Sequence, residues 1–360
     1  MAHDGVPGRA PPIAGTVVAM TVLLGRHDCF SRHDTGPHHP ERADRLEAVL
    51  SGITSAGVAE ALIEFEPRPA TREELCLVHD EVYVAALERF CAAGGGMIDA
   101  DTVVSTPSFE AALRAAGAGP ESAERMRDGG IDAAFLAVRP PGHHALATRA
   151  MGFCLFNNVA VTAASLARAG ERVLIVDWDA HHGNGTQAMF YERSDVCYVS
   201  LHQYPFYPGT GSLREIGSGE GLGTTVNVPM PEGTGGEAYR AAFDLVIEPV
   251  AERFGPTWVL ISAGFDAHRA DPLTDLGLSA GDFADLTVRS LRLAPVGRRI
   301  AFLEGGYDLE ALASSAGACV AALAGETFRP EPASGAGQGG EQALGVVAAA
   351  RRLHLTEPPG

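Results

Sequence analysis

The chain has 360 residues, a formal net charge of −18 and a hydrophobic fraction of 46%. This composition is typical of a globular protein with enough apolar material for a core, and it excludes a largely disordered chain. The excess of acidic residues argues against a general nucleic-acid binder, because phosphate binding requires clustered cations. The length fits one large domain, since open α/β sheets often reach this size as one unit.

The cysteines and the apolar segments bear on the cellular compartment. Six cysteines are scattered along the chain, with no short-spaced pair that resembles a disulfide framework or a thiolate metal site. No apolar run reaches the ~20 residues of a membrane span, and no secretory signal is convincing. We therefore expect reduced, buried thiols, no membrane association and a cytoplasmic location.

Short β-branched runs alternate along the chain with longer Ala- and Leu-rich segments, a pattern typical of a parallel sheet with crossover helices. The expected strands are 17–24, 133–138, 173–176, 196–201, 225–228, 258–262 and 300–303. The expected helices are 41–57, 81–93, 108–128, 158–169, 237–254, 281–293 and 309–323. The sequence predicts an α/β fold with a layer of helices on each face of the sheet.

The two ends of the chain differ from the middle in composition. Residues 1–12 and 329–340 are rich in Gly and Pro, which predicts flexible segments. A short helix is expected at 341–354. We therefore predict an N-terminal extension over 1–12, one large domain over 13–325, and a linker with a short C-terminal helix over 326–360.

Unusual polar residues follow four of the expected strands. They occupy 139–144 after the strand 133–138, 177–182 after 173–176, 264–266 after 258–262, and 304–307 after 300–303. Ligands of open α/β sheets bind at the carboxyl ends of the strands. We therefore expect the four polar segments to meet at one edge of the sheet.

Asp179 and His181 are candidate ligands of a metal ion. They stand two residues apart at a strand end, so in an extended chain both side chains project from the same face. Asp266 is the best candidate for a third ligand, because it follows another strand and Gly264 leaves room for the backbone. Two carboxylates and one imidazole leave a position open for water, as in catalytic zinc sites. Taken alone, the Asp-x-His pair would also fit a helix cap or a surface loop.

A pair of histidines and a tyrosine are candidates for the chemistry beside this site. His143 and His144 follow two prolines and a glycine, and a tight loop is needed to bring both imidazoles to one place. Such a pair offers a general base for metal-bound water and a second group that stabilises developing charge. Tyr307 could donate a hydrogen bond to a carbonyl oxygen that becomes an oxyanion, although a lone Gly-Gly-Tyr is more often a turn.

Together these residues resemble the histone deacetylase superfamily, in particular its class II and bacterial deacetylase-like branch. The resemblance extends over about residues 17–323. The matching motifs, in chain order, are His39-Pro40-Glu41-Arg42, the segment 139–144, Gly152-Phe153-Cys154, the segment 177–185, Pro208-Gly209-Thr210-Gly211, Asp266 with Asp271-Pro272-Leu273, and the segment 304–307.

The resemblance implies an arginase/deacetylase-like three-layer fold with a central eight-stranded parallel sheet, and a deacetylase catalytic domain over 13–325. It also implies one catalytic Zn²⁺, held by Asp179, His181 and Asp266, and hydrolysis of the amide of an Nε-acetyl or other acyl lysine in a protein or peptide. The chain contains no Lys, so it cannot be its own lysine substrate.

The resemblance also assigns roles around the metal ion. His144 would act as general base and acid, oriented by the neutral amide of Asn184. His143, held by Asp177, would supply electrostatic support, and Tyr307 would polarise the amide carbonyl. His182 is left without a role.

A narrow acyl-lysine channel is a further implication of the resemblance. Phe153 and Tyr207 match its two walls, with Tyr207 at a position where Phe is more usual, and Gly152 lines it. Leu273 matches a position at the channel mouth. Asp101 lies in a loop that resembles the clamp for the substrate backbone, although a capping or surface role fits it about as well.

One or two structural K⁺ or Na⁺ ions are also implied by the resemblance. The first would lie near Asp177, Asp179, His181, Ser200 and Leu201, and the second near the carbonyls of Phe190, Arg193 and Val196.

Three other functions remain in competition. An acetylpolyamine amidohydrolase would share the catalytic set and suit an acidic surface, but one such group carries Glu where this chain has Leu273. A two-manganese ureohydrolase needs more carboxylates, and Gly183 and Gly264 stand where two of them would be required. A non-catalytic acyl-lysine binding module of the same fold is the third alternative. We expect no direct nucleic-acid partner and leave formation of a homo-oligomer open.

Overall fold

The computed structural model describes residues 20–356, so the expected extension 1–12 and the start of the expected strand 17–24 lie outside the described residues. Eight parallel strands form the central sheet in the order β2-β1-β5-β10-β9-β6-β7-β8. They are β1 (Val22–Gly25), β2 (Leu62–Phe65), β5 (Ala133–Leu136), β6 (Val173–Asp177), β7 (Val196–Gln203), β8 (Thr225–Met230), β9 (Trp258–Ala263) and β10 (Arg299–Leu303). The expected eight-stranded α/β fold is confirmed.

Two short strands and one edge strand were not expected from the sequence. β3 (Gly96–Met97) and β4 (Val103–Val104) form a separate antiparallel pair. β2 lies at the edge of the main sheet, where Ile63 and Glu64 are exposed. An edge strand with two exposed residues lacks the continuous apolar run that predicts the central strands.

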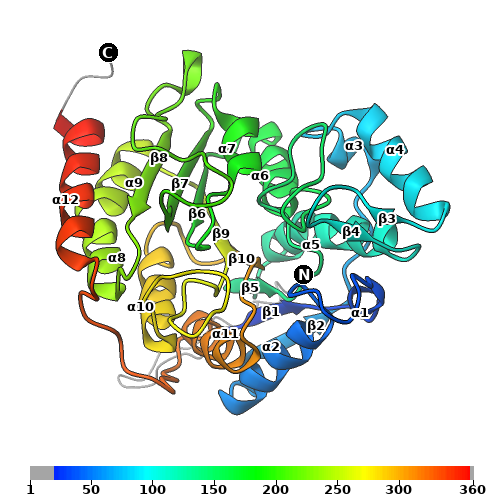
Figure 1. Cartoon of the computed structure of the whole chain (residues 1–360), viewed down its shortest axis with the longest axis horizontal. Helices are drawn as coiled ribbons and strands as arrows, with labels where there is room; N and C mark the ends of the chain where they lie inside the picture. Colours follow the sequence, from blue (N-terminus) through cyan, green and yellow to red (C-terminus); the bar gives the residue numbers. More distant parts are fainter. Residues whose placement is uncertain (1–19, 357–360) are drawn as a thin grey trace, which may run out of the picture.

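Helices cover both faces of the sheet. They are α1 (Cys29–Arg32), α2 (Asp44–Ser55), α3 (Arg72–Leu75), α4 (Glu81–Ala92), α5 (Ser108–Arg127), α6 (Asn158–Arg168), α7 (Asn184–Phe190), α8 (Gly236–Ala242), α9 (Glu248–Phe254), α10 (Ala280–Ser290), α11 (Leu309–Leu323) and α12 (Gly340–Arg351). In Figure 1, α2, α11 and α10 lie on one side of the sheet and α5 and α6 on the other. The predicted helix 237–254 is present as α8 and α9, joined by the π-helical turn Phe243–Ile247.

The Gly/Pro-rich segment before α12 is held against α10, although its composition predicts a flexible segment. The hydroxyl of Ser334 donates to Oδ2 of Asp282 over 2.6 Å, and the hydroxyl of Ser279 donates to the carbonyl of Pro332 over 2.7 Å. Nε2 of His268 lies 2.8 Å from Oε2 of Glu331. Asp282 also accepts from the backbone N–H of Ser334, so side chains of α10 and its N-cap Ser279 satisfy backbone groups that the irregular segment leaves without a regular partner.

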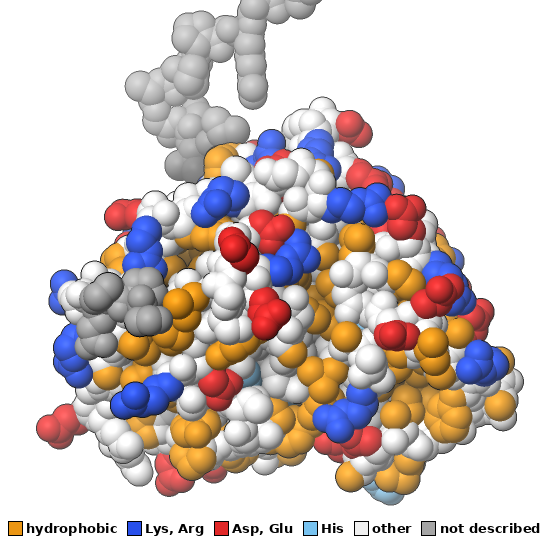
Figure 2. Space-filling model, turned by 90° about the horizontal axis from the view of Figure 1, so that it is seen from above, with side chains coloured by type: hydrophobic (Ala, Val, Ile, Leu, Met, Phe, Trp, Pro, Cys, Tyr) orange, Lys and Arg blue, Asp and Glu red, His pale blue; other side chains and the backbone are white. Residues whose placement is uncertain are grey.

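All six cysteines are free, as expected, and five are buried, whereas Cys76 is exposed because it caps the end of the short helix α3 at the surface. None of the helices within residues 20–356 combines the length and the apolar character that a membrane span requires. Figure 2 shows acidic and basic side chains interspersed with hydrophobic ones over the face that it presents.

Candidate active site

The four strands that precede the polar segments are neighbours at the centre of the sheet, in the order β5-β10-β9-β6. Because these strands are parallel, their carboxyl ends lie at the same edge. The segments 139–144, 304–307, 264–266 and 177–182 therefore meet there. The sheet order explains how residues more than a hundred positions apart in the sequence come to share one site.

Asp179, His181 and Asp266 lie together at this edge, with one candidate ligand atom from each within 4.8 Å of the others. Nδ1 of His181 is 3.0 Å from Oδ2 of Asp266 and 3.2 Å from Oδ1 of Asp179. Both carboxylates are buried, and among residues 20–356 neither forms an ion pair with an arginine. Burial and the nearby charge of Asp179 raise the pKa of Asp266 to about 7.

These three residues fit a divalent metal ion. Two buried carboxylates side by side repel each other, and a cation between them would remove that cost. Oxygen and imidazole nitrogen are both ligands of Zn²⁺, and three protein ligands leave a position for water or substrate.

Two glycines make room for the carboxylates. A Cβ on Gly264 would lie 2.0 Å from Oδ2 of Asp179, and a Cβ on Gly305 would lie 2.2 Å from Oδ2 of Asp266. The backbone N–H of Gly305 donates to Oδ2 of Asp179 over 2.8 Å. The backbones of the loops after β9 and β10 therefore approach the triad at distances that only glycine permits.

His143 and His144 lie next to each other beside the triad, with ring centroids 4.0 Å apart. Each ring is oriented through Nδ1: that of His143 lies 3.0 Å from Oδ2 of Asp177, and that of His144 lies 2.8 Å from Oδ1 of Asn184. Oδ2 of Asp177 also accepts a 3.0 Å hydrogen bond from the hydroxyl of Tyr198, a residue that the sequence did not single out.

The two histidines have opposite electrostatic surroundings. Burial opposes the protonation of His143, but the carboxylates of Asp179 and Asp177 outweigh it and raise the pKa of His143 to about 10. Burial and the neighbouring imidazoles of His143 and His181 hold the pKa of His144 well below its usual value. His144 therefore favours the neutral form, which can accept a proton.

Glu304 fixes the loop that carries the histidines. Its Oε2 accepts hydrogen bonds from the backbone N–H groups of Gly142, over 2.7 Å, and His143, over 3.2 Å. Glu304 is buried, and this burial raises its pKa to about 7. The residue stood within the motif 304–307, but its partners lie on another strand end, so the sequence offered no signal for its contacts.

The loop of Tyr307 is held from two sides. Nε of Arg45 donates to the carbonyl of Gly306 over 2.7 Å, and its guanidinium carbon lies 5.1 Å from the centroid of the Tyr307 ring. On the other side, Oδ2 of Asp271 accepts a 2.7 Å hydrogen bond from the backbone N–H of Tyr307. Arg45 and Asp271 are thus positioning residues that the sequence did not assign.

A buried ion network anchors Arg45 in turn. Oε1 of Glu41 lies 3.2 Å from Nη1 of Arg45, and Oε2 of Glu41 lies 2.7 Å from Nη2 of Arg139. All three side chains are 0% exposed. Burial opposes ionisation of Glu41, but Arg139 outweighs it and lowers the pKa of Glu41 to about 2.

The residues expected to line a channel surround the histidines and Tyr307. The Phe153 ring lies 5.7 Å from the Tyr307 ring, and the Tyr207 ring lies 5.2 Å from the His144 ring. Gly152 has a φ of +55°, and a Cβ there would lie 2.5 Å from Cδ2 of His144. The wall beside His144 therefore requires a glycine at this position.

Asp101 and Leu273 lie further from the triad. Oδ1 of Asp101 accepts a 2.9 Å hydrogen bond from the hydroxyl of Thr102, whose oxygen accepts a 3.1 Å hydrogen bond from the backbone N–H of Phe153. Asp101 therefore connects to the backbone of Phe153 through one residue. The backbone N–H of Leu273 donates to Oδ1 of Asp271 over 3.0 Å, which places Leu273 near the anchor of Tyr307.

His182, to which the sequence assigns no role, is buried and belongs to a polar network that reaches the surface at Thr210. Its Nδ1 lies 2.8 Å from the hydroxyl of Thr210, and its Nε2 lies 3.0 Å from Oε1 of Gln187. The amide of Gln187 donates to Oε2 of Glu215 over 2.6 Å. The network ties the connection between β7 and β8, which carries Tyr207, to the segment after β6 that carries Asp179 and His181.

The residues expected around structural cations lie on β6 and β7, in the segment after β6, and at and just after the end of α7. Asp177 is paired with Ser200 in the parallel register of β6 and β7, and Leu201 follows Ser200. At the start of β7, the backbone N–H of Arg193 donates to the carbonyl of Phe190 over 3.0 Å, and Val196 is the first residue of the strand.

The fold and this edge define an α/β protein with a candidate metal-ion site at the carboxyl ends of its central strands. Residues 39–323 match the histone deacetylase domain family. A probable deacetylase from Archaeoglobus fulgidus is 42% identical over 306 residues, which cover 83% of this chain and 85% of that protein. The chloroplastic histone deacetylase 10 of Oryza sativa is 40% identical over 314 residues, which cover 80% of this chain and 70% of that protein.

The structural comparison agrees with the sequence comparison. A crystal structure of the HDA15 HD domain matches with a TM-score of 0.84 and 38% identity, covering 92% of this chain and 94% of that one. The chain belongs to the histone deacetylase family, as the resemblance implied. The family and these relatives indicate that the chain is a deacetylase, a hydrolase that acts on acetylated substrates.

Proposed function

We propose that this protein hydrolyses the amide of Nε-acetyl or other acyl lysine with one Zn²⁺ held by Asp179, His181 and Asp266. The observation that carries the proposal is the position of the triad beside two histidines whose Nδ1 atoms have different partners, a carboxylate for one and an amide for the other. A bound Zn²⁺ would acidify water and polarise the amide carbonyl.

His144 is the proposed general base and acid. Its Nδ1–H donates to the amide oxygen of Asn184, which leaves Nε2 unprotonated and able to take a proton from the attacking water. As the new C–O bond forms and the C–N bond breaks, the same nitrogen returns the proton to the departing amine. The neutral amide of Asn184 fixes the tautomer without adding a negative charge that would raise the pKa of His144.

His143 and Tyr307 are the proposed stabilisers of charge. The ion pair with Asp177 favours the protonated form of His143, so a positive charge lies beside the oxygen that develops negative charge. Tyr307 would donate its hydroxyl hydrogen to that oxygen. Arg45 and Asp271 hold the Tyr307 loop, so the donor is oriented before the substrate binds.

The substrate side of the proposal rests on the channel residues. Phe153 and Tyr207 would enclose the aliphatic stem of an acyl-lysine, with Gly152 against His144 and with Leu273 and Asp101 nearer the mouth.

Ser200, Leu201 and Asp177 would hold one structural K⁺ or Na⁺ together with Asp179 and His181, and the carbonyls of Phe190, Arg193 and Val196 would hold a second. We also propose that the protein acts in the cytoplasm.

The deciding experiment compares kcat/KM for an acetyl-lysine peptide, longer acyl-lysine peptides and acetylated polyamines on one zinc-loaded preparation. We expect the acyl-lysine peptides to be preferred. A polyamine preference of about tenfold, which corresponds to ~1.4 kcal/mol of transition-state stabilisation, would instead identify an acetylpolyamine amidohydrolase. Lack of turnover with all three substrates, together with absence of bound zinc, would indicate a non-catalytic module.

A further inference from the structure

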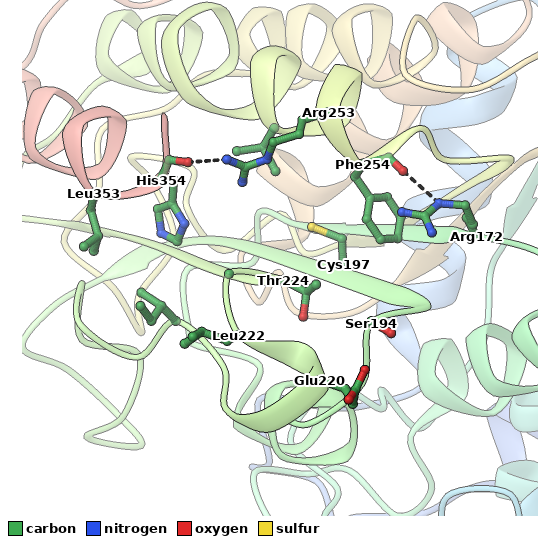
Figure 3. A pocket seen from close by; sticks show the side chains of 13 residues that line it. Arg172, Ser194, Cys197, Glu220, Leu222, Thr224, Arg253, Phe254, Leu353 and His354 are labelled. Carbon is green, nitrogen blue, oxygen red and sulfur yellow. Dashed lines mark hydrogen bonds between the residues drawn. The ribbon is translucent and has the colours of Figure 1, made fainter. Parts of the chain in front are cut away.

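A second cavity lies at the opposite edge of the sheet. It has a volume of about 660 Å³, which is within the range of small-molecule sites. Arg172 directly precedes β6, Cys197 is the second residue of β7 and Thr224 directly precedes β8, so the amino ends of these strands form one wall. Arg253 and Phe254, at the end of α9, lie across from them (Figure 3).

Two arginines line this cavity, and backbone carbonyls hold both. Nε of Arg172 donates to the carbonyl of Phe254 over 2.8 Å, and its guanidinium lies 4.3 Å from the centroid of the Phe254 ring. Nη1 of Arg253 donates to the carbonyl of His354 over 2.6 Å (Figure 3). These contacts fix the two guanidinium groups but use only one of the five N–H donors on each.

Among the described residues neither arginine is in an ion pair with a carboxylate; the pKa of Asp195 is lowered first by its partner Arg193 and to a lesser extent by Arg172. Within residues 20–356, no ion pair includes Arg172 or Arg253, whereas many other arginines of this acidic chain are paired, as Arg26 is with Glu64. Glu220 is the single acidic residue among those that line the cavity, and it forms no ion pair with either arginine. The cavity therefore combines two fixed positive charges whose remaining N–H groups are available to an anion.

His354 adds a polar group that lacks a partner. Its side chain is 5% exposed, and its Nε2 is buried with no hydrogen-bond partner among the described residues. The imidazole points into the cavity from the end of the last helix (Figure 3). A buried ring nitrogen without a partner is unfavourable, so a ligand that reaches it would gain a hydrogen bond that the protein alone does not supply.

The rest of the lining is mainly apolar. Val250 and Phe254 are buried, and Leu222, Ile216 and Leu353 contribute partly exposed aliphatic side chains. A small-molecule site typically combines apolar walls with a few convergent polar groups. The complementary ligand has an anionic head for the arginines and an apolar body for the aliphatic wall.

We propose that this cavity binds a small organic anion, a carboxylate or phosphate monoester on an apolar body, held by Arg172 and Arg253. The site is separate from the catalytic one. Arg172 precedes β6 and Asp179 follows it, and seven residues of roughly extended chain span about 20 Å. The proposal is therefore independent of the proposed function.

The test is isothermal titration of the full metal-loaded chain with octanoate and with octyl phosphate, alongside inorganic phosphate and octylamine. We expect saturable binding of at least one of the two octyl anions, and the tighter of them identifies the head group. Inorganic phosphate should bind at least tenfold more weakly, because it lacks the apolar body, and octylamine should not bind.

Variants assign the binding to this cavity. Arg172→Gln and Arg253→Gln should each weaken binding of the octyl anion at least tenfold, whereas Arg292→Gln, an exposed arginine outside the cavity, should leave it unchanged. Leu222→Trp should block the cavity without altering either arginine. Binding that survives Arg253→Gln and Leu222→Trp unchanged, equal binding of octylamine, or no binding of either anion would overturn the proposal.

Discussion

The two edges of the central sheet differ in how they hold charge. At the carboxyl edge, Asp179, Asp266 and Glu304 are buried, and backbone N–H groups or imidazoles contact their oxygens. At the amino edge, Arg172 and Arg253 are exposed, each donates to a backbone carbonyl, and Arg172 also lies over the Phe254 ring. The strands between them are buried and mainly apolar. Charged groups at both edges lie at or next to the ends of strands and helices, and those of the carboxyl edge are buried whereas those of the amino edge are exposed.

The largest expected effect at the carboxyl edge is loss of the metal ion. Asp266→Ala removes one of three ligands, so we expect loss of bound zinc and a fall in kcat/KM of roughly a thousandfold or more. Metal analysis of the purified variant beside His144→Ala, which should keep its zinc, checks this. Stoichiometric zinc in Asp266→Ala would contradict the proposed ligand set.

The buried ion network of Glu41, Arg45 and Arg139 should contribute more to the free energy of unfolding than an exposed ion pair does. Glu41→Gln leaves Arg139 and Arg45 buried without their anion, and breaking such a buried pair costs about 3–5 kcal/mol of the free energy of unfolding. Glu64→Gln removes the partner of Arg26 from an exposed pair and should cost under about 1 kcal/mol. Urea unfolding of both variants compares them, and equal losses would show that the buried network is not an anchor.

Removing one hydroxyl should test the proposed oxyanion donor. Tyr307→Phe keeps the ring beside Phe153 and the backbone contact to Asp271, so folding and zinc content should not change. The rate constant kcat should fall by about 10²–10³, as for loss of one oxyanion donor. Near-native turnover of this variant would refute the mechanism.

The sequence predicted the candidate catalytic and metal-binding residues at the carboxyl edge better than the residues that hold their loops in place. The triad, the histidine pair and Tyr307 follow expected strands, and parallel strands place such residues at one edge. Glu304 and Arg45 lay within or near recognised motifs, yet their roles depend on backbone atoms from distant strand ends. No spacing rule connects Arg45 to the carbonyl of Gly306, 261 positions away. β2 was missed because an exposed edge strand lacks an apolar pattern.

Buried histidines away from the triad should make the protein sensitive to mild acid. In His79, Nδ1 lies 3.1 Å from the carbonyl of Leu146 and Nε2 accepts a 2.9 Å hydrogen bond from the N–H of Asn157, so the folded state needs the neutral ring. Burial lowers its pKa to about 4. The unfolded state therefore binds the proton more tightly, and this contribution to stability is complete above pH ~6.5 and is lost as the pH falls toward ~4.

Urea unfolding at pH 7.0 and pH 4.5 measures this loss. We expect His79→Gln to reduce the difference between the two pH values by about 1–3 kcal/mol, since each pKa unit corresponds to ~1.4 kcal/mol. The exposed His38 provides the control, and His38→Gln should leave the difference unchanged. An identical difference in the wild type and in His79→Gln would show that His79 is not a source of the acid sensitivity.

The smallest effects are expected at the amino edge. Arg253→Gln alters an exposed side chain far from the triad, so the free energy of unfolding should stay within about 0.5 kcal/mol of wild type, and turnover of an acetyl-lysine peptide should not change. Thermal unfolding and steady-state assays measure both. A large loss of turnover would show that the two edges are coupled.

The order of strands in the sheet has a consequence for biosynthesis. β10 is the last strand to leave the ribosome, yet it lies between β5 and β9 at the centre of the sheet. Until residues up to Leu303 have been synthesised, β5 has no neighbour on that side, and the backbone N–H and C=O groups along the facing edges of β5 and β9 stay unpaired. A nascent chain of this protein must therefore keep exposed strand edges from pairing wrongly until Leu303 has been translated, a period in which chaperone binding would protect it.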